Sequence, residues 1–167
     1  MIIAEDACII IDLININLLD VQLTLEAKFI TTDLIINEIT SNNQKNTLDN
    51  SEFIRQVEIK GFEKEDSINE LLNFNAKNNS ISLSDNSVLF LAKKRKSILL
   101  TNDRRLTKIA KEKYNIETHG IFWLIELLLS KEIINKTEAK NAMELLRKTN
   151  NRIKKSLLDD FIKRLAL

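Results

Sequence analysis

Residues 97–106 read Ser97-Ile98-Leu99-Leu100-Thr101-Asn102-Asp103-Arg104-Arg105-Leu106. The apolar run stops abruptly at a polar turn that holds an acid, and a basic amphipathic segment follows at once. This pattern predicts a buried strand that delivers Asp103 to its carboxyl end. In open α/β sheets ligands bind at that edge, so carboxylates at the ends of other strands would share a site with Asp103.

Strand-like and helix-like segments alternate on both sides of this stretch. Apolar strand candidates lie at residues 2–4, 28–31, 56–59, 97–100 and 116–118. Helical patterns lie between them at 7–19, 64–76 and 104–113, with further helices expected after Thr32 and after Ser82 or Ser84. Parallel neighbours need long crossover connections, so the alternation predicts a parallel sheet with helices on both faces.

Two other segments fit around this alternation. The Asn-rich segment 41–50 is expected to be a helix end followed by a loop. From Gly120 onward the pattern is purely helical, with helices predicted at 121–131, 137–148 and 156–165. These helices would form a C-terminal cap on the α/β core.

Composition limits the class of protein. A chain of 167 residues, 44% hydrophobic and 29% charged, fits one globular domain. No apolar run approaches the roughly 18 residues that span a membrane, and the N-terminus lacks a signal-peptide pattern, so we expect a cytoplasmic protein. The single cysteine, Cys8, excludes an intrachain disulfide and a cysteine-based metal cluster. Two glycines and no proline exclude glycine-rich phosphate loops.

Acidic residues recur at equivalent points of the predicted units. Asp6 closes the first strand, Glu38 follows the second, Asp85 begins the helix before the fourth, and Asp103 closes the fourth. If strands one and four are neighbours, the four acids meet at one edge. Carboxylates without histidine or cysteine partners suit Mg²⁺ or Mn²⁺, and such clusters support phosphodiester hydrolysis. The alternative is that each acid is a helix cap or a solvated surface residue.

Four blocks of the chain together resemble the PIN-domain family. They are residues 3–13, 29–39, 83–92 and 99–106, and residues 119–124 are similar to a segment of the branch related to VapC toxins. The resemblance implies one three-layer α/β/α domain over 1–167, with a core at 1–129 and a helical extension at 130–167. It also implies a parallel five-stranded sheet of order 3-2-1-4-5 and RNA cleavage that depends on Mg²⁺ or Mn²⁺.

The resemblance also implies roles for individual residues. The catalytic acids that hold the metal would be Asp6, Glu38, Asp85 and Asp103. Thr101 and Asn102 would orient Asp103 or a nearby water molecule, although many relatives carry Asp where this chain has Asn102. Asp12 recurs in many relatives at the same offset in the first block, and its place well along the helix favours an orienting or helix-face role over a ligand role.

Basic and aromatic residues near these blocks have two interpretations each. Arg104, Arg105 and Lys108 follow the last acid and could hold RNA phosphates, although a solvated surface explains them equally well. The same alternatives apply to the basic segment 93–96 and to the basic residues between 147 and 155. His119 is interpreted as a structural hydrogen-bonding residue rather than a proton carrier, and Trp123 as a packing residue rather than a base-stacking one.

The leading functional hypothesis is a metal-dependent endoribonuclease. Its narrower form is the toxin of a type II toxin–antitoxin pair, whose partner would be a cognate antitoxin protein. The family resemblance also suggests a homodimer, for which the apolar helices of the C-terminal third could serve. A second hypothesis is a catalytically silent PIN-like module that binds RNA or protein. A third is a metal-dependent DNA nuclease.

Overall fold

A sheet of five parallel strands forms the centre of the molecule, in a computed structural model that describes residues 1–165. The strand order is β3-β2-β1-β4-β5, as predicted. The register places Ala4 of the central strand beside Ile30 on one side and Leu99 on the other. The strands are β1 (Ile2–Glu5), β2 (Lys28–Thr32), β3 (Glu58–Lys60), β4 (Ile98–Leu100) and β5 (Thr118–His119).

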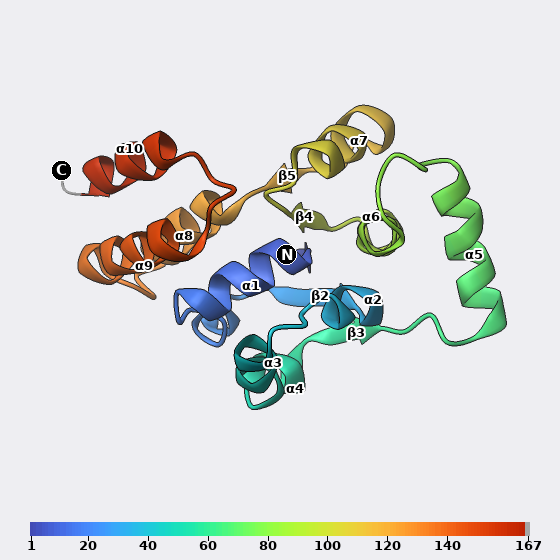
Figure 1. Ribbon diagram of the computed structural model, residues 1–167, viewed down its shortest axis with the longest axis horizontal. Coiled ribbons are helices and arrows are strands. Elements are labelled where there is room, and N and C mark those ends of the chain that lie inside the picture. Colours follow the sequence, from blue (N-terminus) through green and yellow to red (C-terminus); the bar gives the residue numbers. More distant parts are fainter. Residues whose placement is uncertain (166–167) are drawn as a thin grey trace.

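Helices cover both faces of this sheet, so the predicted α/β fold class is confirmed (Figure 1). One face carries α1 (Ala7–Asn15), α8 (Ile121–Ser130), α9 (Lys136–Thr149) and α10 (Lys155–Leu165). The other face carries α2 (Asp33–Asn37), α5 (Glu65–Ala76), α6 (Leu83–Arg95) and α7 (Arg104–Tyr114). A short 3-10 helix (Val21–Thr24), α3 (Asn42–Asp49) and α4 (Glu52–Gln56) complete the described elements.

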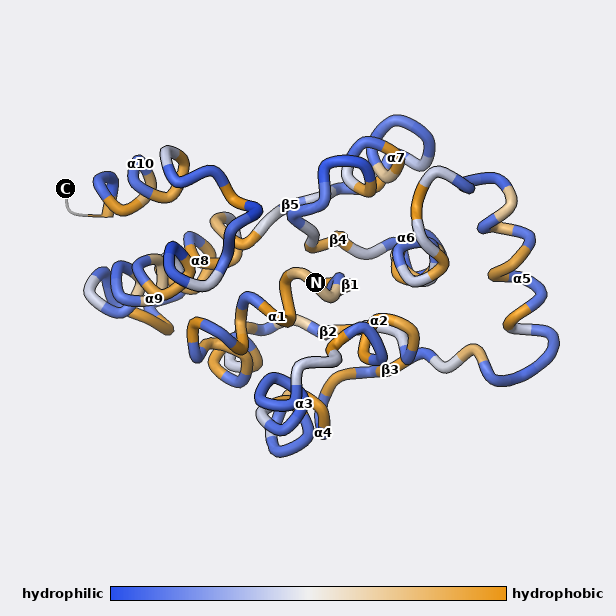
Figure 2. Tube along the Cα trace, viewed as in Figure 1, coloured by the Kyte–Doolittle hydropathy of each residue, from blue (hydrophilic) through white to orange (hydrophobic). Residues whose placement is uncertain are grey.

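The C-terminal helices belong to the same hydrophobic core as the sheet. Ile121, Leu124, Ile125 and Leu128 recur at helical spacing along α8 and are fully buried. Phe161 of α10 stacks on Phe122 of α8 with ring centroids 4.9 Å apart. Figure 2 shows hydrophobic and hydrophilic residues interspersed along α8 and α9, and the buried residues of α9 are Ala139, Ala142, Met143 and Leu146. These apolar faces are therefore used within the chain, and a homodimer stays a prediction.

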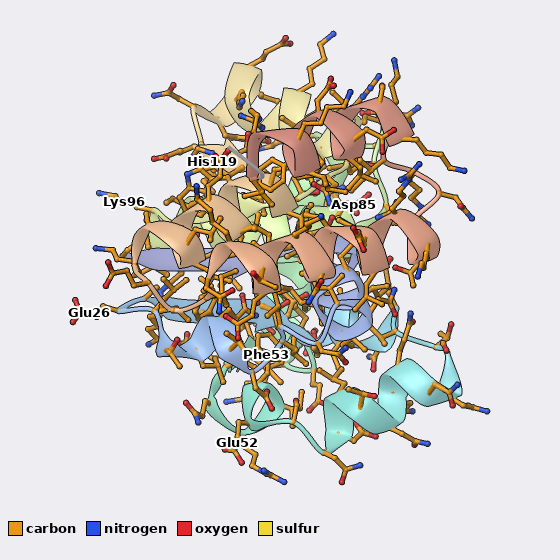
Figure 3. The ribbon with its side chains drawn as sticks, turned by 90° about the vertical axis from the view of Figure 1, so that its left-hand side faces the viewer. Glu26, Glu52, Phe53, Asp85, Lys96 and His119 are labelled. Carbon is orange, nitrogen blue, oxygen red and sulfur yellow. The ribbon has the colours of Figure 1, made fainter. Side chains whose placement is uncertain are left out.

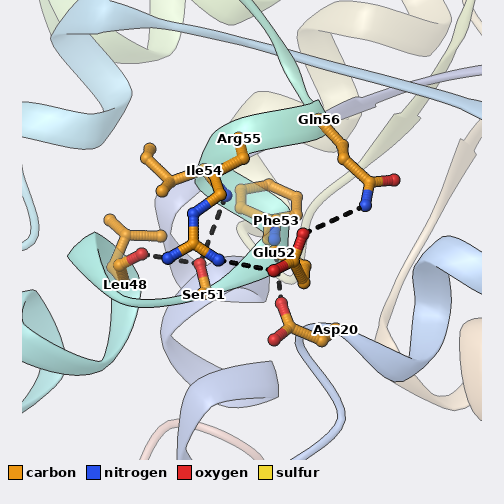
Figure 4. Close-up of polar contacts among 8 residues, drawn as sticks. All are labelled: Asp20, Leu48, Ser51, Glu52, Phe53, Ile54, Arg55 and Gln56. Atoms are coloured by element: carbon orange, nitrogen blue, oxygen red, sulfur yellow. Dashed lines mark hydrogen bonds and ion pairs between the residues drawn. The ribbon is translucent and has the colours of Figure 1, made fainter.

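The region before β3 differs from its prediction. The segment 41–50 forms the helix α3, and a second helix, α4, ends at Gln56, so that β3 begins at Glu58 rather than at residue 56. Ser51 caps α4 by accepting a hydrogen bond from Ile54 N, and Asp20 Oδ1 accepts one from Phe53 N (Figure 4). Phe53 is thereby fixed in the core with no exposed surface. Neither capping residue belongs to the predicted strand, and together they stabilise a helix ahead of β3, which begins at Glu58.

Two further boundaries differ from the prediction. The first helix ends at Asn15 rather than at residue 19, since the backbone turns at Asn17 with a positive φ of 59°. β5 forms at Thr118–His119, beyond most of the predicted strand at 116–118. No helix within residues 1–165 is long and apolar enough to cross a membrane.

A view from the side distinguishes the amino ends of the five strands from their carboxyl ends. Figure 3 shows Glu26 and Lys96, which precede β2 and β4, on the left of the molecule. Asp85, at the start of α6, lies on the right. The carboxyl ends of the parallel strands therefore meet on the side of Asp85, where the sequence predicts the functional site.

Candidate active-site cleft

A cleft of about 900 Å³ opens at the carboxyl edge of the sheet. Its wall is formed by the ends of β1 and β4, the end of α2, the segment before α6, the start of α7, and the loop between α9 and α10. All four acids predicted from the sequence line it, namely Asp6, Glu38, Asp85 and Asp103. The topology thus brings together side chains that are up to 97 residues apart, from position 6 to position 103.

Asp6 is the most deeply buried of these acids, with 4% of its surface exposed. It caps α1, because Oδ1 accepts a hydrogen bond of 2.7 Å from Ala7 N. Oδ2 accepts further bonds from Thr101 Oγ1 (2.7 Å) and Cys8 Sγ (3.0 Å). Burial raises the pKa of Asp6, the neighbouring charge of Asp85 raises it further, and the three hydrogen bonds oppose that rise.

Asp103 is exposed and is fixed through the backbone of its own turn. Its Oδ1 accepts a hydrogen bond of 2.8 Å from Leu106 N and so caps α7. Its amide donates to Thr101 Oγ1 over 3.0 Å. Thr101 is 3% exposed, and its hydroxyl therefore joins the side chain of Asp6 to the backbone of Asp103.

Glu38 and Asp85 line the cleft from the neighbouring helices. Asp85 forms a capping box with Ser82, in which Asp85 Oδ2 accepts from Ser82 N and Ser82 Oγ accepts from Asp85 N. The sequence left the cap open between Ser82 and Ser84, and the structure selects Ser82. Glu38 follows the last residue of the short helix α2 and is exposed.

These acids form a donor set that fits a hard divalent cation. All the donors are carboxylate oxygens, which Mg²⁺ and Mn²⁺ prefer, and the pKa of Asp6 is raised partly by the charge of Asp85, which a bound cation would offset. Only one oxygen each of Asp85 and Asp103 is used as a helix cap. Within residues 1–165 no three acidic, histidine or cysteine side chains already gather closely enough to hold a metal, so binding requires the side chains to turn inward.

Asn102 lines the cleft, and its side chain connects two helices. Its Nδ2 donates to Asp12 Oδ2 over 3.1 Å, while its Oδ1 accepts from Ile121 N over 3.1 Å. The side chain therefore joins α1 to the start of α8. Asp12 is 2% exposed and is not among the residues that line the cleft. Burial raises the pKa of Asp12 to about 6, against hydrogen bonds from Asn150 and Asn102.

The predicted phosphate-binding residues are divided by the structure. Arg104 and Arg105 line the cleft, and Arg105 donates to Ser80 O over 2.9 Å. Lys108 is exposed further along α7 and is not among the lining residues. The basic segment 93–96 ends α6, and Lys96 lies at the opposite edge of the sheet from Asp85 (Figure 3).

The single histidine makes structural contacts. His119 stacks on Trp123 with ring centroids 4.2 Å apart and an interplanar angle of 8°. Its Nε2 lies 2.6 Å from Glu117 Oε1. Neither His119 nor Trp123 lines the cleft, so these contacts agree with the packing interpretation of both residues.

Sequence reasoning missed three contributors to the cleft and its support. Asn150 lines the cleft from the C-terminal loop, and Cys8 Sγ contacts both Asp6 and the amide of Asn102. Gly120 leaves room for Asn102, because a Cβ atom there would lie 2.5 Å from Asn102 Oδ1. The position of Gly120 directly after a predicted strand was the one sequence signal for these contributors. Nothing in the local sequence marks Asn150 or Cys8 as part of the cleft or its support.

A parallel sheet of order 3-2-1-4-5 with carboxylates gathered at its carboxyl edge defines a PIN-like α/β domain. A family model described as PIN domain, DUF3368, matches residues 2–166, and the chain therefore belongs to this family of PIN domains. PIN domains are generally nucleases.

A solved structure has a similar fold. The crystal structure of PAE2754 from Pyrobaculum aerophilum matches with a TM-score of 0.51 and 16% sequence identity, over 76% of this chain and 98% of that chain. At this identity the likeness concerns the fold alone. No curated protein sequence matches the chain significantly.

Proposed function

We propose that this chain is a metal-dependent endoribonuclease. The observation that supports it is the cleft in which Asp6, Glu38, Asp85 and Asp103 lie together with Arg104 and Arg105. Carboxylate oxygens suit Mg²⁺ or Mn²⁺, and arginines suit phosphate groups. A site with both can hold a phosphodiester next to a divalent cation, and membership in a nuclease family points the same way.

The acids would hold the metal, and their neighbours would fix the acids. Mg²⁺ or Mn²⁺ on these carboxylates would lower the pKa of a water molecule and offset negative charge on the phosphodiester oxygens. Asp6 is locked by three hydrogen bonds, so it would form the rigid part of the site. Asp103, Asp85 and Glu38 are more exposed and can turn toward a cation.

The test is cleavage of a labelled single-stranded RNA by the intact chain. We expect cleavage with Mg²⁺ or Mn²⁺, no cleavage with a chelator, and loss of cleavage in Asp6→Asn and Asp103→Asn. Asparagine is as good a helix cap as aspartate, so Asp103→Asn removes the charge and keeps the cap of α7. In Asp6→Asn the new amide faces the Thr101 hydroxyl and the Cys8 thiol, so urea unfolding must verify that this variant is folded. Cleavage that persists in the chelator, or full activity in both variants, would overturn the proposal. A matched single-stranded DNA that is cut faster than the RNA would favour the DNA nuclease.

The toxin role is the narrower part of the proposal. If the chain is a toxin, its expression stops growth, and Asp103→Asn relieves the arrest because the site is lost. A small protein encoded beside it should bind the chain and suppress cleavage. Normal growth during expression of an active enzyme would contradict the toxin role and leave the nuclease role intact.

One observation favours a second candidate, the catalytically silent module that binds RNA or protein. Within residues 1–165 the acids are not gathered into a group ready to hold a metal. If this candidate is right, the chain binds RNA or a partner protein without binding Mn²⁺. Calorimetric titration of the intact chain with Mn²⁺ separates the two candidates.

A further inference from the structure

The loop between α9 and α10 forms part of the cleft wall. Asn150, Arg152 and Ile153 of this loop line the same cleft as the four acids, although the other lining residues come from positions 6–105. Arg152 is exposed, and no acid within residues 1–165 lies within ion-pair distance of it, although its charge lowers the pKa of Asp12. The C-terminal extension thus brings a cation without a direct ion pair to the carboxyl edge of the sheet.

A hydrogen-bonded turn fixes the backbone of Arg152. Asn150 Oδ1 accepts hydrogen bonds from Arg152 N (2.8 Å) and from Ile153 N (3.0 Å). Asn150 Nδ2 donates to Asp12 Oδ1 over 2.8 Å. Both ends of the Asn150 amide are therefore used, one to shape the loop and the other to attach it to α1.

The anchor of this loop is itself part of the site's framework. Asp12 is buried in α1, and its second oxygen accepts from Asn102, which lies between Thr101 and Asp103. One buried carboxylate thus joins the loop of Arg152 to the turn that holds Asp103. Hydrogen bonds to a charged group are stronger than neutral ones, so this connection holds the loop against the cleft.

Arg152 reaches the cleft from the opposite face of the sheet to the other two arginines. Arg104 and Arg105 begin α7, which packs on the α6 side, and Arg105 is bound to Ser80 O. The loop of Arg152 extends from helices on the α1 side (Figure 1). The acids at the ends of β1 and β4 lie between the α1 side and the α6 side of the sheet. A polyanion bound across these acids would therefore have Arg152 on one side and Arg104 and Arg105 on the other.

We propose that Arg152 binds a backbone phosphate of single-stranded RNA, and that Asn150 is the positioning residue that holds it there. This inference rests on the proposed function, because it assigns the substrate of the same cleft. Arginine suits the role, since its planar group donates two parallel hydrogen bonds to phosphate oxygens. The C-terminal helices α9 and α10 then contribute to substrate binding as well as to the core.

The test measures RNA affinity of the intact chain by fluorescence anisotropy, in a chelator that prevents cleavage, over a series of salt concentrations. A single-stranded phosphate contact contributes about 0.7 to the slope of log affinity against log salt. We expect Arg152→Gln to lower the slope by about 0.7 and the affinity about five-fold at 0.1 M salt. Arg152→Lys should keep the slope, because the charge remains.

Two further variants serve as controls. Lys155→Gln removes an equal charge from the nearby start of α10, outside the cleft, and should leave the slope unchanged. Asn150→Ala should weaken RNA binding when Arg152 is present and have no further effect in the Arg152→Gln background, because the two residues act as a unit. Urea unfolding of each variant verifies that it is folded.

The outcomes separate this inference from the proposed function. An Arg152→Gln slope equal to that of the wild type, or an equal loss in Lys155→Gln, overturns the inference alone. Additive losses from Asn150→Ala and Arg152→Gln overturn the positioning role. A wild-type chain that cleaves RNA with Mn²⁺ but has no affinity for RNA in the chelator overturns the inference alone. A wild-type chain that neither binds RNA nor cleaves it with Mn²⁺ overturns the proposed function together with the inference.

Discussion

Thr101 Oγ1 donates a hydrogen bond of 2.7 Å to Asp6 Oδ2 and so ties the end of β4 to the end of β1. The same hydroxyl accepts the amide of Asp103 over 3.0 Å. One buried side chain thus sets the relative positions of two acids from distant parts of the chain. The geometry of the cleft therefore depends on a residue that is not itself one of the four acids.

Replacing Thr101 tests this connection. Thr101→Val keeps the shape and removes the hydroxyl, which leaves Asp6 without one donor and the Asp103 amide without its acceptor. We expect the free energy of unfolding in urea to fall by about 1–3 kcal/mol, and RNA cleavage to fall with it. Thr101→Ser keeps the hydroxyl and should preserve most of the activity. Equal activity of the Val and Ser variants would rule out this role.

Asp103 has a structural role that can be separated from its charge. Asp103→Ala removes the cap of α7 and should lower the free energy of unfolding by about 1 kcal/mol, whereas Asp103→Asn should leave it nearly unchanged. Both variants should lose RNA cleavage. Thermal and urea unfolding supply the stability comparison. If the Asn variant were as unstable as the Ala variant, the cap would not be the cause.

Gly120 should tolerate no side chain. A Cβ atom there would lie 2.5 Å from Asn102 Oδ1, which accepts the hydrogen bond of Ile121 N. Gly120→Ala should therefore displace Asn102 and cost about 1–3 kcal/mol in urea unfolding. Gly61→Ala is the matched control, because its Cβ would make an ordinary contact of 3.6 Å with Asp33 Oδ2. Similar unfolding midpoints for the two variants would contradict the packing at Gly120.

Glu5 makes stability depend on pH. Burial raises its pKa from 4.5 to about 8, and its Oε1 has no hydrogen-bond partner within residues 1–165. Between these two values the folded chain keeps a proton that the unfolded chain has lost, so the contribution of Glu5 to stability falls as the pH rises from about 4.5 to about 8.

Glu5→Gln removes this dependence because its amide stays neutral. Relative to the wild type, the variant should gain up to roughly 4 kcal/mol in free energy of unfolding between pH 5 and pH 8. Urea unfolding at both pH values measures the gain. Glu26→Gln, at an exposed position, should show no such gain. If the free energy of unfolding of Glu5→Gln differed from that of the wild type by the same amount at both pH values, Glu5 would not be protonated in the folded chain.

The parallel sheet follows from features that are visible in the sequence, whereas its strand order was predicted from the resemblance to a family. Apolar strands alternating with helical spacing leave few parallel topologies, and the acids mark the strand ends. The helix α4 was not predictable in this way, because its start is fixed by Asp20, which is distant in sequence from Phe53. Local pattern favoured a strand at 56–59, and α4, which Ser51 and Asp20 both cap, moves its start to Glu58.

The cleft was predicted through Asp6, Glu38, Asp85 and Asp103, but its C-terminal wall was not. Asn150 bonds to Asp12 across 138 residues, and the sequence gives no sign of that pairing. The hydrogen bonds of Asn102 were not predictable for a similar reason, since its partners lie in α1 and at the start of α8. Local spacing identifies groups at strand ends, whereas packing alone determines which distant loop covers them.

The most direct test of the central claim is calorimetric titration of the intact chain with Mn²⁺. If the four carboxylates form a metal site, the wild type binds Mn²⁺, and Asp6→Asn and Asp103→Asn each weaken binding by more than about ten-fold while remaining folded. A wild type that binds no Mn²⁺, or binding that is unchanged in both variants, would contradict the account.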